Sequence, residues 1–314
     1  MTLPDDVVGS VAVTSEITLF VNPTAGRGRG ARAAQPAASA LRAAGFSVRT
    51  VLGQNAEDAL TRARAAVEAG TGALVAVGGD GMANLALQAV AGTRTPLGLV
   101  AVGTGNDFAR ALGLPVRDPA AAGRVVAEAL KGARLRDIDL GRVDGTWFGT
   151  VLAAGFDSRV NDRGNRMRWP TGRFKYDLAM LADLAMLAEL ASFRPFPFRI
   201  TLDGGEVREI EATLVAVGNG SSYGGGMKIC AGADLTDGLF DVTVVGDCSR
   251  RSLLRVFPQV YKGTHLGHPK ITVHRVAKIE LAAEGITGYA DGEPLGPLPL
   301  TAECIRGAVR VAVP

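Results

Sequence analysis

The sequence contains few cysteines and few histidines, and both shortages narrow the kinds of site that it can carry. Among 314 residues there are three cysteines and three histidines. Cys230, Cys248 and Cys304 are odd in number and widely separated, which fits reduced thiols in a cytosolic protein better than a disulfide framework. His265 and His268 are three residues apart, but the glycine and proline beside them indicate a loop. We therefore expect packing or surface roles for these histidines and no metal site.

The chain also lacks long apolar runs and a strong net charge. No stretch reaches the roughly 18 apolar residues that a membrane span requires. The segment MTLPDDVVGSVAV carries two acids and no basic stretch, so we expect no signal peptide. The formal net charge of +3 does not predict nucleic-acid binding, but it is compatible with docking on an anionic membrane surface or with holding phosphates.

The hydrophobic pattern changes halfway along the chain. Length suggests two domains, and 47% hydrophobic residues can supply a core for each. In the first half, short apolar runs alternate with helical segments, which is typical of a parallel sheet covered on both faces. From residue 137 the apolar residues alternate with period two around Asp144-Gly145, a strong hairpin signal. We predict an α/β domain followed by a mostly antiparallel β domain, with the boundary near residue 137.

Residues 73–110 carry the strongest functional signal. A buried strand at 73–77 breaks into Gly78-Gly79-Asp80-Gly81 before a helix at 82–90. The glycines let a phosphate approach the backbone N–H groups, and the positive end of the helix faces the same point. Because Asp80 would repel a bare phosphate, we expect it to act through a divalent cation, with Mg²⁺ favoured.

A second turn of the same kind follows the next strand. Residues 97–102 are apolar, and Gly103-Thr104-Gly105-Asn106-Asp107 then opens a helix. Thr104 offers a hydroxyl and Asn106 an amide to a nucleotide, while Asp107 is placed to cap the helix. Glycine turns of this kind can also be purely structural. Two in succession, with polar residues at the strand ends, favour a nucleotide site.

The loop after the first strand is also rich in glycine and arginine. It follows residues 17–21 and reads Asn22-Pro23-Thr24-Ala25-Gly26-Arg27-Gly28-Arg29-Gly30. Proline defines the turn, glycines keep the loop open, and the arginines put positive charge where a phosphate would lie. A flexible turn without a ligand is the alternative.

These motifs resemble the catalytic domain of the diacylglycerol kinase family of lipid kinases, whose relatives include sphingosine and ceramide kinases and, more distantly, NAD kinase. The resemblance rests on VGGDGMAN and PLGLVAVGTGNDFAR, and the Asn22 loop is similar to the family's NPxxGxG motif, with Arg27 at its phosphate-contacting position. Two residues depart from the family's usual motifs. Met82 follows Gly81 where the family has the threonine of GGDGT, and Leu85 follows Asn84 where it has the glutamate of NE.

Two motifs of the second half resemble the same family. In VGNGSSYGGGMKICAGADLTDGLFDV, the side chains of Asp234 and Asp237 and the carbonyl of Leu239 are three oxygen donors, and the resemblance implies a structural metal there; an acidic turn is the alternative. Asp291-Gly292-Glu293-Pro294 matches the family's DGE, although alone it would be an ordinary turn. We favour Glu293 as general base, with Asp291 as its alternative or electrostatic partner.

An apolar helix predicted at 177–190 follows a run of basic residues. Core packing is the simpler interpretation, and the alternative is a wall of an acyl-chain groove or a contact with the bilayer. The resemblance favours Arg168, within the basic run, as a clamp on the γ-phosphate.

The resemblance spans nearly the whole chain and implies a specific architecture. A Rossmann-like α/β nucleotide-binding domain of residues 16–136, which residues 303–314 would complete, is expected beside an antiparallel β-sandwich lipid domain of residues 137–302. The active site would lie in the cleft between them. The implied catalytic residues are Glu293, Asp291 and Asp80; the implied ATP-binding residues are Asn22, Pro23, Gly26, Arg27, Gly78, Gly79, Asp80, Gly81, Met82, Asn84, Gly103, Thr104, Asn106 and Asp107.

The implied activity is that of an ATP- and Mg²⁺-dependent lipid kinase, with diacylglycerol as the favoured acceptor and phosphatidic acid as product. NAD kinase is an alternative, although the second-half motifs argue against it. A non-catalytic lipid- or nucleotide-binding homologue is another, motivated by Met82 and Leu85. We expect a cytoplasmic protein, peripheral at the inner membrane face, with no nucleic-acid partner and with a homodimer as an option.

Overall fold

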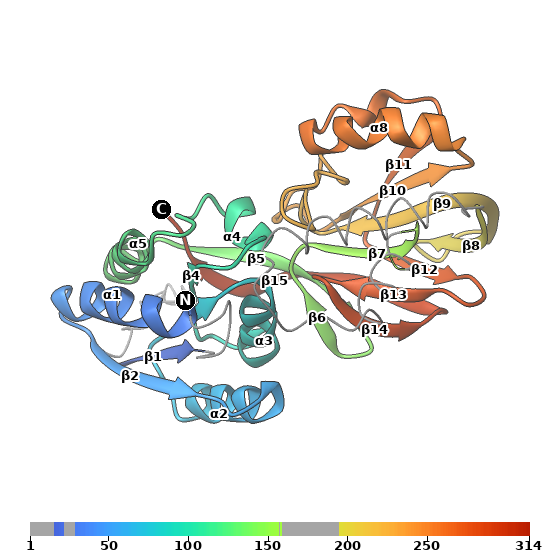
Figure 1. Cartoon of the computed structure of the whole chain (residues 1–314). Coiled ribbons are helices and arrows are strands. Elements are labelled where there is room, and N and C mark those ends of the chain that lie inside the picture. The colour runs from blue at the N-terminus through green and yellow to red at the C-terminus, as the bar shows by residue number, and fades with distance from the viewer. Residues whose placement is uncertain (1–15, 22–28, 157, 159–194) are drawn as a thin grey trace, which may run out of the picture.

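The computed structural model describes residues 16–21, 29–156, 158 and 195–314. An α/β half with helices on both faces of its sheet lies beside a half built mainly of strands (Figure 1). Within the described residues, one continuous hydrogen-bonded network of fifteen strands joins the two halves. The predicted fold class, α/β followed by an antiparallel β-sandwich, is confirmed.

The sheet of the first half is parallel, in the order β4-β3-β1-β2. Every residue of β3 and β4 is buried, because helices cover both faces. Helices α1 and α5 pack with one face of the sheet, and α2 and α3 with the other. The elements are β1 (Glu16–Val21), α1 (Arg29–Ala43), β2 (Ser47–Leu52), α2 (Ala56–Glu68), β3 (Leu74–Gly78), α3 (Asp80–Val90), β4 (Leu97–Ala101), α4 (Asp107–Ala111) and α5 (Pro119–Lys131).

The strands of the second half pair with one another in antiparallel fashion. The Asp144-Gly145 turn joins β5 to β6 as predicted, with positive φ at both residues. The elements are β5 (Leu135–Val143), β6 (Thr146–Phe148), β7 (Val151–Gly155), β8 (Phe196–Leu202), β9 (Arg208–Gly218), β10 (Phe240–Gly246), α8 (Arg250–Lys262), η1 (His265–Gly267), β11 (Ile271–Val276), β12 (Lys278–Ala282), β13 (Thr287–Ala290), β14 (Glu293–Pro297) and β15 (Leu300–Ala312).

The last strand connects the two halves. β15 pairs antiparallel with β12 and β5, and its Val311 then pairs parallel with Leu97 of β4. Because β15 and β5 run through both halves, the strand pairing marks no sharp boundary between them. The domain boundaries therefore stay a prediction.

Two parts of the second half differ from the sequence-based expectation. The sequence of residues 270–281 carries one run of strand signals and so predicts one strand. It forms two strands, because the chain changes partners at Ala277: β11 pairs with β10, whereas β12 pairs with β8 and β15. Helix α8 was not predicted. Its signals were present, since the Ser249 side chain accepts the N–H of Ser252 at the N-terminus and Gly263, with φ of 72°, ends the helix.

Candidate active site

The two glycine turns predicted from the sequence lie against each other at the carboxyl ends of β3 and β4. A Cβ atom added to Gly103 would lie 2.5 Å from the Cα of Gly79, and one added to Gly79 would lie 3.1 Å from the Cα of Gly103. Only glycine allows backbones to approach this closely. The turns thus form one surface, at the sheet edge where ligands of open α/β sheets bind.

Asp80 joins the first turn to the second. Its Oδ2 accepts the N–H of Asn106 and its Oδ1 accepts the N–H of Asp107, both at 2.7 Å. These amides open α4, so Asp80 caps that helix from a distant part of the chain. This corrects the expectation that Asp107 caps α4. Each Asp80 oxygen accepts one hydrogen bond, which leaves capacity for another partner.

Asp107 instead connects the first half to the glycine loop of the second. Its Oδ2 accepts the N–H of Gly225 at 2.7 Å, and its Oδ1 accepts the Ser222 hydroxyl at 3.3 Å. Burial raises the pKa of Asp107, the hydrogen bond from Gly225 opposes that rise, and the negative charge of Asp80 adds to it. Two acidic side chains from successive turns therefore repel one another at the junction of the two halves.

Two residues expected to contact a nucleotide have other partners. The Asn106 side chain, 2% exposed, is closed on its own turn: its Oδ1 accepts the Gly103 N–H at 2.8 Å and its Nδ2 donates to the Gly103 carbonyl at 3.0 Å. The side chain of Met82 is buried in the core against Gly78, and its N–H donates to the Gly79 carbonyl at 3.0 Å. These contacts occupy the Asn106 amide and bury the Met82 side chain, and the nucleotide contact of both residues stays a prediction.

Asp291 occupies the first position of a two-residue hairpin between β13 and β14. Its φ is 51° and that of Gly292 is 87°, as an Asp-Gly turn of this kind requires. The Asp291 carboxylate accepts four hydrogen bonds. They come from the Gly149 N–H (2.7 Å), the Thr150 N–H (2.8 Å), the Thr150 hydroxyl (2.5 Å) and the Asn84 amide (3.3 Å).

The four donors distinguish Asp291 from Glu293. A carboxylate has about four lone-pair positions, so Asp291 has none left for a reacting hydroxyl. Burial raises the pKa of Asp291, and the hydrogen bonds, first that from Thr150, oppose the rise. Glu293 is exposed, and its Oε1 lies 3.7 Å from the position of a Cβ on Gly81, at the start of α3. Among the described residues, its carboxylate has no hydrogen bond or ion pair.

Asn84 and Thr104 are two further residues of the first half that are predicted to bind ATP. Asn84 donates to Asp291 and, at 3.4 Å, to the Trp147 carbonyl, so it ties α3 to the second half. Thr104 is exposed and its carbonyl accepts a hydrogen bond from Arg117 at 3.1 Å. The Asn84 amide is therefore already engaged, and the nucleotide contact of the Thr104 hydroxyl stays a prediction.

The acidic loop between β9 and β10 does not present a ready set of metal ligands. Asp234 accepts the N–H and hydroxyl of Thr236 at 2.9 and 2.7 Å. Asp237 is ion-paired with Arg275 and accepts the N–H of Leu239 at 2.9 Å. In the described part of the chain, no group of three or more His, Cys, Asp or Glu side chains could hold a metal. A cation there would have to compete with the Arg275 guanidinium for Asp237, and the metal role of Asp234, Asp237 and the Leu239 carbonyl stays a prediction.

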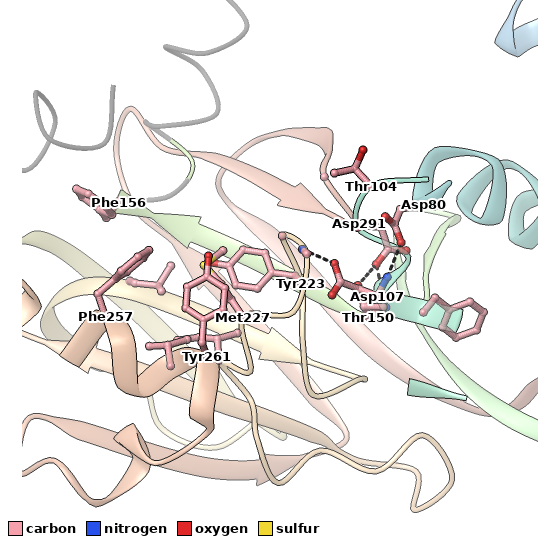
Figure 2. Close-up of a pocket in the computed structure, with 18 of the residues that line it drawn as sticks. Asp80, Thr104, Asp107, Thr150, Phe156, Tyr223, Met227, Phe257, Tyr261 and Asp291 are labelled. Atoms are coloured by element: carbon pink, nitrogen blue, oxygen red, sulfur yellow. Dashed lines mark hydrogen bonds between the residues drawn. The ribbon is translucent and has the colours of Figure 1, made fainter. Parts of the chain in front are cut away.

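A cavity of about 620 Å³ leads from the junction of the turns into the second half (Figure 2). One end, which we call the acidic end, is formed by Asp80, Asp107 and Asp291, with Thr104 and Thr150 beside them. The opposite, apolar end lies under α8, which the sequence analysis missed. Its lining includes Phe156, Leu214, Tyr223, Met227, Ile229, Val245, Leu253, Leu254, Val256, Phe257, Val260 and Tyr261.

Several predicted residues lie outside the described ranges. They are Asn22, Pro23, Gly26, Arg27, Arg168 and the apolar helix of residues 177–190. The phosphate clamp of Arg27 and Arg168 therefore stays a prediction. In the ranges that the structure does describe, no helix combines the length and apolar character needed to cross a membrane.

Comparisons with known proteins agree with this arrangement. Residues 16–143 match the diacylglycerol kinase catalytic domain, and residues 150–313 match the YegS C-terminal NAD kinase beta sandwich-like domain. The chain is 43% identical over 304 residues to a diacylglycerol kinase of Mycobacterium tuberculosis strain H37Rv, covering 95% of both chains. It is 29% identical over 285 residues to a diacylglycerol kinase of Bacillus subtilis, covering 90% of each.

Solved structures share the fold across both halves. A diacylglycerol kinase from Bacillus anthracis superposes with a TM-score of 0.70 at 23% identity, over 96% of this chain and 97% of that one. A NAD kinase from Archaeoglobus fulgidus, in complex with ATP, superposes with a TM-score of 0.54 at 15% identity, over 95% and 93%. These two likenesses concern the fold alone. The family matches and the 43% identity go further: the chain is a kinase and belongs to the diacylglycerol kinase family of lipid kinases.

Proposed function

We propose that this protein transfers the γ-phosphoryl group of ATP, with Mg²⁺, to the hydroxyl of a membrane lipid, with diacylglycerol as acceptor and phosphatidic acid as product. The observation that carries the proposal is the cavity, whose acidic end meets the glycine turns and whose remaining wall is apolar. A lipid whose hydroxyl lies at the acidic end and whose acyl chains lie against the apolar wall matches this distribution of polar and apolar residues. We place the reaction at the cytoplasmic face of the membrane, where ATP and the lipid meet.

The apolar wall favours a lipid over a dinucleotide acceptor. Polar groups taken out of water cost free energy unless they find hydrogen-bond partners, and charged groups cost much more. NAD would bring ribose hydroxyls and a pyrophosphate, whereas the wall under α8 consists of Leu, Val, Ile, Met and aromatic side chains. Acyl chains gain free energy on entering such a wall.

Asp80 and Asp107 fit a divalent cation. Mg²⁺ is usually bound by one or two carboxylates together with substrate phosphates. Both carboxylates line the cavity, Asp80 has acceptor capacity left, and the charge of Asp80 contributes to the raised pKa of Asp107. A bound Mg²⁺ would offset that repulsion and neutralise charge on the phosphoryl oxygens.

Glu293 is our candidate for the general base. A lipid hydroxyl is a weak nucleophile, and a carboxylate with free lone pairs can take its proton as the phosphoryl group is transferred. Glu293 meets that requirement beside Gly81, where the first N–H groups of α3 are available to phosphate oxygens. Asp291 has the different role of positioning Thr150 and Asn84 at the acidic end.

The test is a phosphoryl-transfer assay with γ-labelled ATP and Mg²⁺, in which diacylglycerol, ceramide, sphingosine, polyprenol and NAD are offered separately. We expect labelled phosphatidic acid, dependent on Mg²⁺. Labelled NADP would support the alternative acceptor. Nucleotide binding without transfer to any of the five acceptors would contradict the proposal and favour a binding protein.

A further inference from the structure

We infer that α8 is the surface through which this protein docks on an anionic lipid bilayer, so that the lipid passes from the bilayer directly into the cavity beneath the helix. The inference rests on the proposed function, because it describes how the acceptor lipid reaches the proposed active site. Helix α8 has exposed apolar side chains and basic residues, and it lies over the cavity.

Helix α8 exposes large apolar side chains. The largest exposed hydrophobic side chains in the described ranges are few, and two of them are on α8: Leu254 is 52% exposed and Tyr261 is 47% exposed. Residues seven apart lie on the same face of a helix, two turns from each other. The others lie in three separate places: Leu52 in β2, Val207 in the loop before β9, and Val273 in β11. Only α8 therefore joins two such side chains in one stripe.

Helix α8 is also strongly basic. The sequence of α8, RRSLLRVFPQVYK, has four basic residues and no acidic one. At about 100° per residue, Arg251, Arg255 and Lys262 fall within about 40° of one another around the helix. All three are exposed, and their stripe adjoins the apolar stripe of Leu254 and Tyr261. Basic residues beside apolar ones are typical of helices that lie in the interface of an anionic membrane.

The exposed stripe of α8 is continuous with the cavity. Leu254 and Tyr261 also line the cavity, together with Phe257 between them. The rings of Phe257 and Tyr261 meet edge to face, with centroids 5.7 Å apart. The side chains exposed to the outside and those facing the cavity are thus neighbours on one helix. An acyl chain leaving the bilayer along this stripe would exchange one apolar surface for another.

Helix α8 is also held firmly enough to present this surface. Val256 and Val260, on the opposite side, are buried, and the Val260 carbonyl accepts the Lys228 N–H at 3.1 Å. The Ser252 hydroxyl lies 3.1 Å from Nε2 of His268. Figure 1 shows α8 on the outer side of the second half. The exposed stripe therefore belongs to a packed helix and not to a loose segment.

The main experiment measures binding to vesicles of phosphatidylcholine, with and without phosphatidylglycerol, by co-sedimentation. The variant is Arg251→Glu with Arg255→Glu, since neither side chain lines the cavity. We expect its affinity for the anionic vesicles to fall by about tenfold or more. The matched control is Arg94→Glu with Arg124→Glu, the same charge change at exposed positions of the first half, which should lose less than about twofold. Equal losses in the two variants would overturn the inference.

A second measurement separates docking from catalysis. A short-chain diacylglycerol, below its aggregation limit, should be phosphorylated equally by the wild type and by the α8 charge variant, whereas diacylglycerol in anionic vesicles should be phosphorylated more slowly by the variant. No transfer to the short-chain lipid by the wild type would refute the proposed function, whatever the vesicle result. Equal rates on vesicles would refute the docking surface alone.

Tyr261→Trp gives a direct readout of insertion. A tryptophan at this position should shift its emission to shorter wavelength on anionic vesicles and be quenched by brominated acyl chains. An unchanged spectrum on vesicles that do bind the protein would show that another surface docks, and would overturn the inference.

Discussion

Asp80 and Asp291 occupy similar motifs, an aspartate followed by glycine at the end of a strand, yet they are held in different ways. Asp80 is partly exposed and accepts two backbone N–H groups, one on each oxygen. Asp291 accepts four donors, two on each oxygen. The comparison shows that the number of donors, and not the motif, decides which carboxylate can still bind a ligand.

The largest effect is expected at Glu293, because neither Asp80 nor Asp291 has its proposed role as general base. Glu293→Gln removes the free carboxylate facing Gly81 while keeping its size, and we expect kcat to fall by about 10²–10⁴-fold, as is usual for loss of a general base. ATP binding should change little. Glu284→Gln, at an exposed position between β12 and β13 that does not line the cavity, is the matched control. If kcat of Glu293→Gln were within twofold of that control, the base would have to be sought at Asp80, whose oxygens each keep acceptor capacity.

Asp291→Asn should cost more stability than Asp80→Asn. The new amide would point N–H groups at some of the four donors, and each buried group left unsatisfied costs about 1–3 kcal/mol. Asp80→Asn affects two donors at a partly exposed position, so its main effect should fall on nucleotide and Mg²⁺ binding. Thermal unfolding and isothermal titration with Mg·ATP measure the two effects. A larger drop in Tm for Asp80→Asn would invert the comparison.

Gly103→Ala tests how much the close contact between the two turns, which Asp80 joins, contributes to the free energy of unfolding. The added Cβ would lie 2.5 Å from the Cα of Gly79, and a backbone cannot move aside as a side chain can. We expect a loss of about 1–3 kcal/mol in the free energy of unfolding, as for overpacking. Gly267→Ala is the control, because its Cβ would meet nothing within 4 Å. Denaturant unfolding compares the two, and equal midpoints would show that the turns can separate at little cost.

The smallest effect concerns His265, which has fewer partners than either aspartate. Its ring is buried, Nε2 lies 3.0 Å from the Ile229 carbonyl, and Nδ1 has no hydrogen-bond partner in the described structure. Burial lowers the pKa of His265 below its usual value, 6.5. The unfolded chain therefore binds the proton more readily, so stability present above pH 6.5 should decline as the pH falls below it.

His265→Gln should flatten that pH dependence, because glutamine keeps a donor for the Ile229 carbonyl and does not titrate. Urea unfolding at pH 7.5 and 5.5, for the wild type and the variant, measures the difference. An equal decline in the two proteins would assign the pH dependence to other groups.

Much of the fold could be predicted because its signals are local. The all-buried runs at β3 and β4, the glycine turns after them and the Asp144-Gly145 hairpin depend on residues close together in sequence. The change of strand partner at Ala277 could not be predicted, because an apolar alternation looks the same whichever neighbour it pairs with. Helix α8 could have been predicted, because its Ser249 cap and its apolar period are local signals.

For the site, the sequence by itself determined the family, the chemical types of the residues and their order, because glycine turns and acidic motifs are written in consecutive positions. Only the tertiary structure decided which of those groups are free. Asn106 is closed on Gly103, Met82 is in the core, and Asp291 is surrounded by Gly149, Thr150 and Asn84. Hydrogen-bond saturation and burial depend on partners as many as 207 positions away, and no local pattern reports them.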